Sequence, residues 1–366
     1  MTRIAVVGAG VAGLGVAYAL REANAEVTVF ERREEVGGRA ATHRRDDCVY
    51  DVGANYCKDD DERVADLLSG DLADGLVDTA GPVWTFDADG EISEGRGDDD
   101  RKWSYREGLA TLGERLRAAS GATVRTGVEV VGLARGDDAD ETAASDEEGW
   151  RVEFESADPD SPMAGEFHAD AVVLTPPAPT TAYLLDRADW DAPGRSETDG
   201  SLRDDLVQAA ADVPYRTLVS VALHYPDRSD LPYYALVNAD KDHDLGWVSR
   251  EECKPGHVPD GESLLVVQPS PEWSRHRYDD EDDEIAVQVA DLTAELLGDP
   301  DRYEFDWADV VRWRDALPDG GADADLLDRG ADADLFFAGD WVAGEGRIHA
   351  ALRSGLETGE RIAERL

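Results

Sequence analysis

Lysine is scarce in this sequence, and the charge balance is far from even. The 366 residues hold 82 Asp and Glu but only 36 Lys and Arg, which gives a formal net charge of −46. The lysines are Lys58, Lys102, Lys241 and Lys254. Nucleic acid is excluded as a partner of such a polyanion. Self-repulsion of this charge would strain a compact fold unless salt screens it.

Closely spaced cysteines and long apolar runs are also lacking. Cys48, Cys57 and Cys253 form no C-x-x-C pair and have no histidine nearby at zinc spacing. We therefore expect neither a disulfide framework nor a metal site. No apolar run approaches the roughly 18 residues of a membrane span, and no signal-peptide pattern precedes the first strand. The expectation is a cytoplasmic protein without a membrane partner.

The acidic residues are scattered along the chain instead of forming one tail. That pattern resembles proteins from salt-accumulating archaea, which carry a solvated carboxylate surface. At molar salt the Debye length falls to about 3 Å, so most of the repulsion disappears. The alternative, an acidic face for a basic partner, would cluster the charge.

The first segment predicts a βαβ unit that binds a nucleotide. An apolar strand at 4–7 leads into Gly-Ala-Gly-Val-Ala-Gly at 8–13, a helix follows to about residue 23, and a second strand at 27–30 ends at Glu31. The three glycines provide the tight turn, the close approach of a pyrophosphate and the helix–strand packing of a G-x-G-x-x-G loop. The helix N-terminus points N–H groups at phosphate, and Glu31 is placed for ribose hydroxyls. This fingerprint does not separate NAD from FAD.

Further elements follow from the apolar patterns. We expect strands at 122–126, 128–131, 171–174, 218–223, 264–267 and 335–338, helices at 285–297 and 348–366, and a solvated loop at 136–149. The alternating segment 150–154 should pair in an antiparallel layer. A length of 366 residues suggests two domains at about 150 residues each.

The segment after Glu31 adds a Gly-Gly-Arg sequence at 37–39, where Arg39 can offer a bidentate cation to phosphate. It resembles the Gly-Gly-Arg segment of the flavin monoamine-oxidase superfamily, whose first βαβ unit binds FAD. The segment 50–56 resembles the one that passes beside the isoalloxazine, and 336–341 resembles the C-terminal signature whose acid, here Asp340, holds the ribityl chain. The helix that opens after Arg347 would stabilise negative charge on the flavin N1/O2 edge.

Within this superfamily the chain resembles the renalases most. The similar segments are Leu174–Pro179, Val213–Tyr225 and Trp313–Pro318. The resemblance implies an α/β fold, with a Rossmann-like FAD-binding domain of the glutathione-reductase type and an inserted α+β substrate domain on an antiparallel sheet. We expect residues 1–60, 105–178 and 311–366 in the FAD-binding domain, and 61–104 and 179–310 in the substrate domain.

The resemblance also implies the cofactor site. The candidate cofactor-binding residues are Gly8, Ala9, Gly10, Ala12, Gly13, Glu31, Arg32, Gly38, Arg39, Gly53, Ala54, Asn55, Tyr56, Val128, Gly339, Asp340, Ile348, His349 and Ala350. Asn55 stands where renalases often carry Gln. No cysteine follows Cys253, so the expected FAD is noncovalent.

Renalases oxidise misplaced dihydronicotinamide isomers of NAD(P)H and pass the electrons to oxygen, so a small flat donor is the expected substrate. The alternatives are a flavin amine oxidase, or another dehydrogenase of the superfamily, and a flavin-binding protein without catalysis. Arg347 replaces the cage tyrosine of amine oxidases, and no lysine follows Lys254.

No catalytic residue is identified by the sequence. Hydride loss from a dihydronicotinamide needs no base, because the ring becomes aromatic. The candidates near the flavin are Asn55, Tyr56 and His349, while His224 and His276 are typical of surface or internally satisfied histidines.

Overall fold

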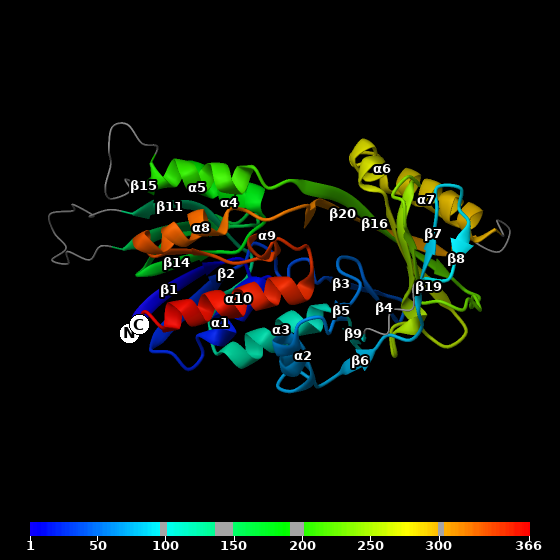
Figure 1. Ribbon diagram of the computed structural model, residues 1–366, viewed down its shortest axis with the longest axis horizontal. Coiled ribbons are helices and arrows are strands. Elements are labelled where there is room, and N and C mark those ends of the chain that lie inside the picture. The colour runs from blue at the N-terminus through cyan, green and yellow to red at the C-terminus, as the bar shows by residue number, and fades with distance from the viewer. Residues whose placement is uncertain (96–100, 136–148, 191–200, 299–303) are drawn as a thin grey trace. The chain divides into compact units, whose positions relative to one another are not determined.

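The computed structural model describes residues 1–95, 101–135, 149–190, 201–298 and 304–366. The chain divides into two compact units, shown in Figure 1. Unit 1 comprises Met1–Gly38, Leu112–Pro214 and Pro318–Leu366, and unit 2 comprises Arg39–Thr111 and Tyr215–Leu317. Residues 39–60, 105–111 and 311–317, expected in the FAD-binding domain, pack in unit 2. Residues 179–214, expected in the substrate domain, pack in unit 1.

Unit 1 is built on a five-stranded parallel sheet. Its strand order is β10 (Thr123–Arg125), β2 (Ala25–Phe30), β1 (Thr2–Val7), β14 (Ala171–Leu174) and β21 (Leu335–Phe337). Near-continuous burial along β1, β2 and β14 explains the unbroken Val, Ile and Leu runs, since a parallel sheet is covered on both faces. The predicted strands at 4–7, 27–30 and 171–174 are confirmed.

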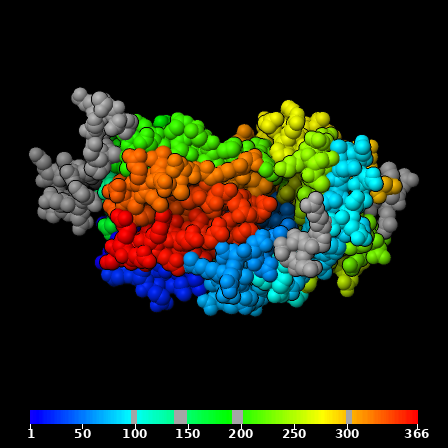
Figure 2. Space-filling view, in the orientation of Figure 1, coloured from blue at the N-terminus to red at the C-terminus, as the bar shows by residue number. Residues whose placement is uncertain are grey.

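Two helices of unit 1 pack against each other with almost no space between their backbones. They are α1 (Val11–Ala19) and α10 (Ile348–Ala363), which lies beside the N-terminal segment in Figures 1 and 2. A Cβ on Gly355 of α10 would stand 2.1 Å from the carbonyl oxygen of Ala12. Only glycine allows this approach, so α10 and the glycine loop hold each other in place.

A second sheet of unit 1 covers the end of β2. It has the order β13 (Ala164–Ala169), β12 (Trp150–Ser156), β11 (Val128–Arg135) and β15 (Asp189–Trp190). The predicted antiparallel pairing of 150–154 is confirmed on both sides. Phe30 packs on Phe154 and Phe167 with ring centroids 5.4 and 5.5 Å apart, which joins the two sheets. Residues 136–148 of the predicted loop lie outside the described residues.

The remaining helices of unit 1 are short and join its strands. They are α3 (Ala110–Ser120), α4 (Ala178–Asp186), α5 (Leu202–Ala211), α8 (Ala324–Asp328), η3 (Arg329–Ala333) and α9 (Asp340–Ala343). The first residues of α3, before Leu112, belong to unit 2.

Unit 2 is built on a seven-stranded mixed sheet. Its order is β20 (Trp307–Pro318), β16 (Tyr215–Tyr225), β19 (Ser263–Pro269), β18 (Leu245–Arg250), β17 (Ala235–Asn238), β7 (Val83–Phe86) and β8 (Ile92–Ser93). The neighbours β16 and β19, β19 and β18, β18 and β17, and β7 and β8 are antiparallel, whereas β17 and β7 run parallel. Alternating side chains of β16 and β19 enter two separate cores, as expected of period-two strands.

Different elements pack on the two faces of this sheet. The helices α6 (Pro271–His276) and α7 (Asp282–Leu297) contribute Trp273, Ile285 and Val289 to one core. The hairpin of β3 (Thr42–Arg45) and β4 (Cys48–Asp51) contributes Tyr50 to the other. The smaller elements are β5 (Cys57–Lys58), α2 (Glu62–Ser69), β6 (Leu76–Asp78), β9 (Lys102–Tyr105) and η1 (Glu251–Cys253).

No helix among the described residues is long and apolar enough to cross a membrane.

Candidate functional site

The candidate cofactor residues of unit 1 gather at one edge of its parallel sheet. Gly8 follows β1, Glu31 follows β2, Thr175 follows β14 and Gly339 follows β21. The carboxyl ends of parallel strands share an edge, which is where open α/β sheets bind ligands. Thr175, which was not among the predicted site residues, donates from Oγ1 to the carbonyl oxygens of Val7 (2.8 Å) and Gly8 (3.1 Å).

The glycine loop has the shape expected of a phosphate-binding turn. Gly8 adopts φ +97°, which favours glycine, and a Cβ on Gly13 would stand 2.0 Å from the Gly8 carbonyl oxygen. A Cβ on Gly10, in contrast, would meet nothing within 4 Å. Gly10 therefore faces open space, and this is the space that a pyrophosphate would need.

The helix that follows this loop, α1, has neither a side-chain cap at Gly10 nor an acid in its first turn. The same is true of α10, whose N-cap is Arg347. In contrast, α2, α5, α6, α7 and α8 all carry acids in their first turns. An uncapped N-terminus with free N–H groups suits a phosphate or a developing flavin anion.

Glu31 lies at the end of β2 and is 8 % exposed. Its Oε2 accepts a hydrogen bond from the Ala9 N–H at 2.8 Å, and its Oε1 accepts one from the Arg33 N–H at 3.0 Å. Val128 donates its N–H to the Glu31 carbonyl oxygen at 2.9 Å. The carboxylate thus holds the glycine loop in addition to any ribose, while Arg32 is exposed.

We expect a Glu31→Gln substitution to weaken this end of β2. A Gln amide has one acceptor oxygen, so its NH₂ group must face the N–H of Ala9 or Arg33. The expected loss of unfolding free energy is about 1–3 kcal/mol, measured by urea unfolding. Glu26→Gln on the same strand, where Glu26 is exposed, is the control. Equal stability of both variants would contradict a structural role of Glu31.

The Gly-Gly pair at 37–38 lies against the glycine loop within unit 1. Gly37 donates its N–H to the Ala9 carbonyl oxygen at 2.8 Å and pairs with Gly10 as an isolated bridge. Gly38 has φ +63°, and a Cβ there would stand 3.1 Å from the Gly10 Cα. Gly37 also has a positive φ of +103°, so both positions beside Gly10 favour glycine over residues with a side chain.

The C-terminal signature packs beside β14. The Gly339 N–H donates to Ser354 Oγ at 3.1 Å, and Trp341 Nε1 donates to the Pro176 carbonyl oxygen at 3.0 Å. Asp340 is 5 % exposed, and its Oδ1 accepts the Trp341 N–H at 3.0 Å.

The first turn of α10 contains the remaining candidates of unit 1. Ile348, His349 and Ala350 open the helix, and His349 is 4 % exposed. His349 Nε2 lies 3.7 Å from Glu345 Oε1. Arg347 is exposed, and its Nη1 donates to the Gly346 carbonyl oxygen.

The other candidates, Arg39 and Gly53–Tyr56, belong to unit 2, where hydrogen bonds hold them in place. Arg39 Nη1 donates to the Ala316 carbonyl oxygen at 3.0 Å, and Ala54 donates its N–H to the Arg39 carbonyl oxygen at 3.0 Å. A Cβ on Gly53 would stand 2.0 Å from that same oxygen. Gln268 Nε2 donates to the Gly53 carbonyl oxygen at 3.0 Å.

Tyr56 forms an aromatic cluster with Tyr234 and Trp247, and Asn55 precedes Tyr56 in the sequence. The ring centroids of the cluster are 6.1–6.2 Å apart. Asn55 Oδ1 accepts from Ser249 Oγ at 3.3 Å. Trp247 Nε1 is buried, and no hydrogen-bond acceptor is found for it among the described residues. Burial raises the pKa of Tyr234, so this phenol stays protonated. The sequence shows the aromatic residues but not which of them meet.

A buried ionic cluster anchors the strand that leads to Gly53. The cluster consists of Asp51, Glu251, Lys254 and His257. Lys254 Nζ lies 2.7 Å from Asp51 Oδ2 and 2.9 Å from Glu251 Oε1, with all three side chains fully buried. His257 Nδ1 lies 2.9 Å from Glu251 Oε2, and its Nε2 lies 2.8 Å from the Tyr105 carbonyl oxygen.

The charges of this cluster balance one another. Burial alone would raise the pKa of Asp51, but Lys254 and His257 outweigh it and hold the pKa below its usual range. Burial alone would lower the pKa of Lys254, but Asp51 and Glu251 outweigh it and raise the pKa. Asp51 Oδ1 also accepts from Thr42 Oγ1 at 2.7 Å and from the Leu109 N–H at 2.8 Å. Lys254 is therefore fully occupied inside unit 2.

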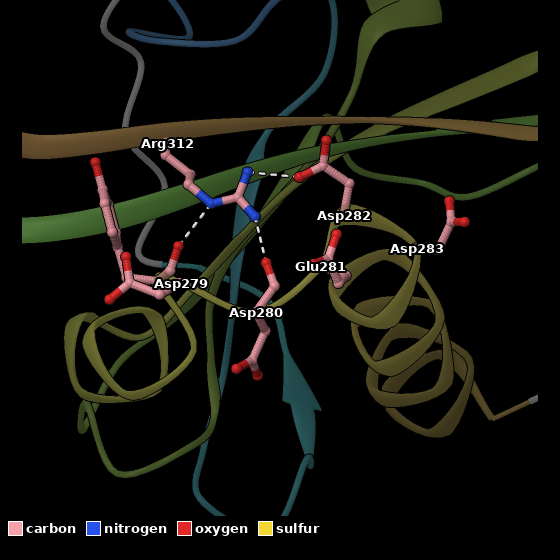
Figure 3. Close-up of a pocket in the computed structure, with 7 residues that line it drawn as sticks. Asp279, Asp280, Glu281, Asp282, Asp283 and Arg312 are labelled. Atoms are coloured by element: carbon pink, nitrogen blue, oxygen red, sulfur yellow. Dashed lines mark hydrogen bonds and ion pairs between the residues drawn. The ribbon is translucent and has the colours of Figure 1, made fainter.

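A surface hollow between α6 and α7 is lined by acids and one arginine (Figure 3). The Arg312 guanidinium donates to the carbonyl oxygens of Tyr278 and Asp280 at 2.6 Å and to Asp282 Oδ1 at 2.5 Å. The donors of Arg312 point at the chain's own oxygens, and the rest of the lining consists of Tyr278 and five acids, so the hollow does not suit an anionic dinucleotide.

Two family descriptions match this chain. Residues 6–70 match the NAD(P)-binding Rossmann-like domain, and residues 76–363 match the flavin containing amine oxidoreductases.

Curated relatives match over short segments. Protoporphyrinogen oxidase 2 of Arabidopsis thaliana is 42% identical over 66 residues, which are 18% of this chain and 13% of the relative. An L-amino-acid oxidase of Crotalus adamanteus is 49% identical over 51 residues, which are 14% of this chain and 10% of the relative. The matched segment thus spans less than a fifth of these relatives.

Solved structures match over the whole chain. A triple mutant of putrescine oxidase has a TM-score of 0.72 at 17% identity, and the cyclohexylamine oxidase of Brevibacterium oxydans IH-35A has a TM-score of 0.70 at 14% identity. Each alignment covers 100% of this chain and 99% of the other. The expected fold class, a Rossmann-like domain with a substrate domain, is confirmed.

Proposed function

Because the chain belongs to the flavin-containing amine oxidoreductase family and is an FAD-dependent oxidoreductase, we propose that it is a renalase-like oxidase. Its proposed donors are dihydronicotinamide isomers of NAD(P)H, small molecules with a flat ring. When bound, FAD supplies the hydride acceptor and transfers the electrons to oxygen, which leaves as hydrogen peroxide. The FAD is proposed to be noncovalent, since no cysteine follows Cys253.

The residues of unit 1 that would hold FAD fit the group. The open space at Gly10 and the uncapped start of α1 would take the pyrophosphate, and Glu31 would bind a ribose. Asp340 is proposed to accept from the ribityl chain, and the start of α10 to face the flavin ring. Arg39 and the segment 53–56 of unit 2 are proposed as cofactor-binding residues on the resemblance of their sequence alone.

The observation that carries the choice of donor is the aromatic cluster in unit 2. Tyr56 and Trp247 offer flat faces, and the Trp247 indole N–H lacks an acceptor among the described residues. A dihydronicotinamide carries both a ring that can stack and a carboxamide oxygen that can accept this hydrogen bond. A buried donor without a partner costs about 1–3 kcal/mol, so a carbonyl-bearing ligand would be favoured over one without a carbonyl group.

Two features argue against an amine as the donor. The position where amine oxidases of this family place a cage tyrosine is Arg347, whose positive charge would oppose the approach of an ammonium. The Lys254 ammonium is paired with Asp51 and Glu251, so Lys254 does not take the place of the lysine that amine oxidases use near the flavin.

Anaerobic stopped-flow bleaching of the flavin tests the proposal. The 2- and 6-dihydro isomers of NAD(P)H should bleach it at least about a hundredfold faster than 4-dihydro NADH or any of a panel of primary amines. The reason is that misplacing the reacting carbon by 1 Å can cost about a hundredfold. Air should then return normal NAD(P)⁺ and hydrogen peroxide.

A matched variant links the result to the aromatic cluster. Trp247→Phe keeps a ring but removes the N–H, so it should raise the KM for the isomers about tenfold while FAD content stays unchanged. Rapid bleaching by a primary amine, with none by the isomers, would replace this proposal with an amine oxidase.

We also propose that the protein works in concentrated salt, as the net charge of −46 suggests. In about 10 mM KCl the Debye length is near 30 Å, so the carboxylates repel one another across the surface. The melting temperature should therefore rise steeply from dilute buffer to molar KCl. Sucrose, which adds no screening, is the control. A melting temperature that does not respond to KCl would exclude this proposal.

A further inference from the structure

Three side chains from separate segments of unit 2 meet outside the proposed flavin and donor site. They are Cys48 at the start of β4, His224 near the end of β16 and Glu262 just before β19. One potential ligand atom of each lies within 4.8 Å of the other two. Cys48 is 1 % exposed and His224 is 7 % exposed, while Glu262 is only partly buried and opens the cluster to solvent.

The orientation of His224 is fixed on three sides. Its Nε2 lies 3.0 Å from Glu262 Oε2, and its Nδ1 lies 3.6 Å from Asp306 Oδ2. The ring stacks on Trp307 with centroids 5.0 Å apart and planes 2° apart. No hydrogen-bond partner is found for His224 Nδ1 among the described residues. A histidine with one nitrogen in a ligand cluster and the other toward a carboxylate has the arrangement of a metal ligand with its supporting acid.

We propose that Cys48 Sγ, His224 Nε2 and Glu262 bind a divalent transition-metal ion of the Zn²⁺ type, with Asp306 orienting His224. A thiolate and a carboxylate together balance the double positive charge. Tetrahedral zinc, with ligand bonds of about 2.0–2.3 Å, places its donors roughly 3.3–3.6 Å apart. His224 Nε2 and Glu262 Oε2 lie 3.0 Å apart, and the ligand atom of Cys48 lies within 4.8 Å of its two partners. A water molecule can complete the coordination.

The donor set selects the class of ion. Sulfur and imidazole ligands suit Zn²⁺ or Co²⁺, whereas Ca²⁺ and Mg²⁺ require oxygen ligands. A cysteine ligand binds as its thiolate, so the ion must displace the thiol proton, and thiophilic ions do so best. The ion would join β4, β16 and β19, which are distant in sequence, and so stabilise unit 2.

The second group of acids and histidine in unit 2 does not compete for this role. Asp51, Glu251 and His257 also lie close together, but the Lys254 ammonium stands among them at 2.7 Å from Asp51 and 2.9 Å from Glu251. A lysine already supplies the cation there.

Cobalt titration of the FAD-loaded protein tests the proposal. One equivalent of Co²⁺ should produce the intense ligand-field bands of a tetrahedral site, at longer wavelengths than flavin absorption, and Zn²⁺ should abolish them. Zn²⁺ at about a hundred times its Kd should raise the melting temperature by roughly 5 °C.

The variants assign the ligands. Cys48→Ser and His224→Gln should each weaken binding at least about a hundredfold, and Asp306→Asn about tenfold. Cys253→Ser, which changes a cysteine outside the cluster, should bind as the parent does. Flavin content and melting temperature without metal show that each variant is folded. Weak octahedral spectra, or a Kd unchanged by Cys48→Ser, would overturn the proposal.

Discussion

A Gly10→Ala variant is expected to fold like the parent protein and to lose most of its FAD. The added methyl group meets no atom of the chain within 4 Å, and the Gly10 backbone (φ −70°, ψ 176°) suits any L-residue. The methyl group would occupy the space proposed for the pyrophosphate. A clash of this kind costs about 1–3 kcal/mol, which corresponds to roughly a tenfold to hundredfold weaker Kd for FAD.

Two other glycines provide the controls. A Cβ on Gly320 also meets nothing within 4 Å, so Gly320→Ala should keep both stability and FAD. A Cβ on Gly13 would stand 2.0 Å from the Gly8 carbonyl oxygen, so Gly13→Ala should lower the melting temperature even of the flavin-free protein. Melting of the flavin-free proteins and fluorescence titration with FAD separate the two effects. Full FAD affinity in Gly10→Ala would remove the glycine loop from the site.

The unit 1 site could be predicted from sequence because its signals are local. Strand, turn, helix, strand and Glu31 follow one another within the first 31 residues, and the structure contains each of them. The hydrogen bonds of Glu31 to Ala9 and Arg33 were not predicted, because sequence shows an acid at a strand end but not which N–H groups face it.

The unit 2 features could not be predicted in the same way. Lys254 and Asp51 pair although they are 203 residues apart in the sequence, and Tyr56 and Trp247 also come from segments that are far apart in the sequence. Sequence spacing likewise gave no reason to join Cys48 to His224. The hairpin β3–β4 was also missed, since residues 42–51 alternate weakly and carry charge.

A Lys254→Met variant should lose about 3–5 kcal/mol of unfolding free energy, because two buried carboxylates would be left with one cation. Lys254 is fully buried between Asp51 and Glu251, whereas Lys241 is exposed, so Lys241→Met is the matched control. Adding Glu251→Gln to Lys254→Met restores the charge balance and should recover part of the loss. A cost below about 1 kcal/mol for Lys254→Met would show that the ionic cluster is not essential to unit 2.

The pH dependence of that loss gives a second, independent check of the cluster. The lowered pKa of Asp51 stabilises the parent protein above about pH 4, and this contribution disappears as the pH falls through the folded pKa. The raised pKa of Lys254 stabilises it below about pH 10, and this contribution disappears as the pH rises through the folded pKa. Between about pH 5 and 9 the contributions of Asp51 and Lys254 are therefore constant in the parent protein.

In Lys254→Met the stability should instead decrease with rising pH between about pH 5 and 8. Without the ammonium, a buried carboxyl of the pair takes up a proton in the folded state more readily than in the unfolded state. The folded state then binds more protons, so stability falls as the pH rises from about 5 to 8, by up to about 1.4 kcal/mol per pH unit for one proton. Urea unfolding at a series of pH values, in molar KCl, measures the difference between variant and parent. A difference that is constant across this range would mean that the two carboxylates find another cation or reach water.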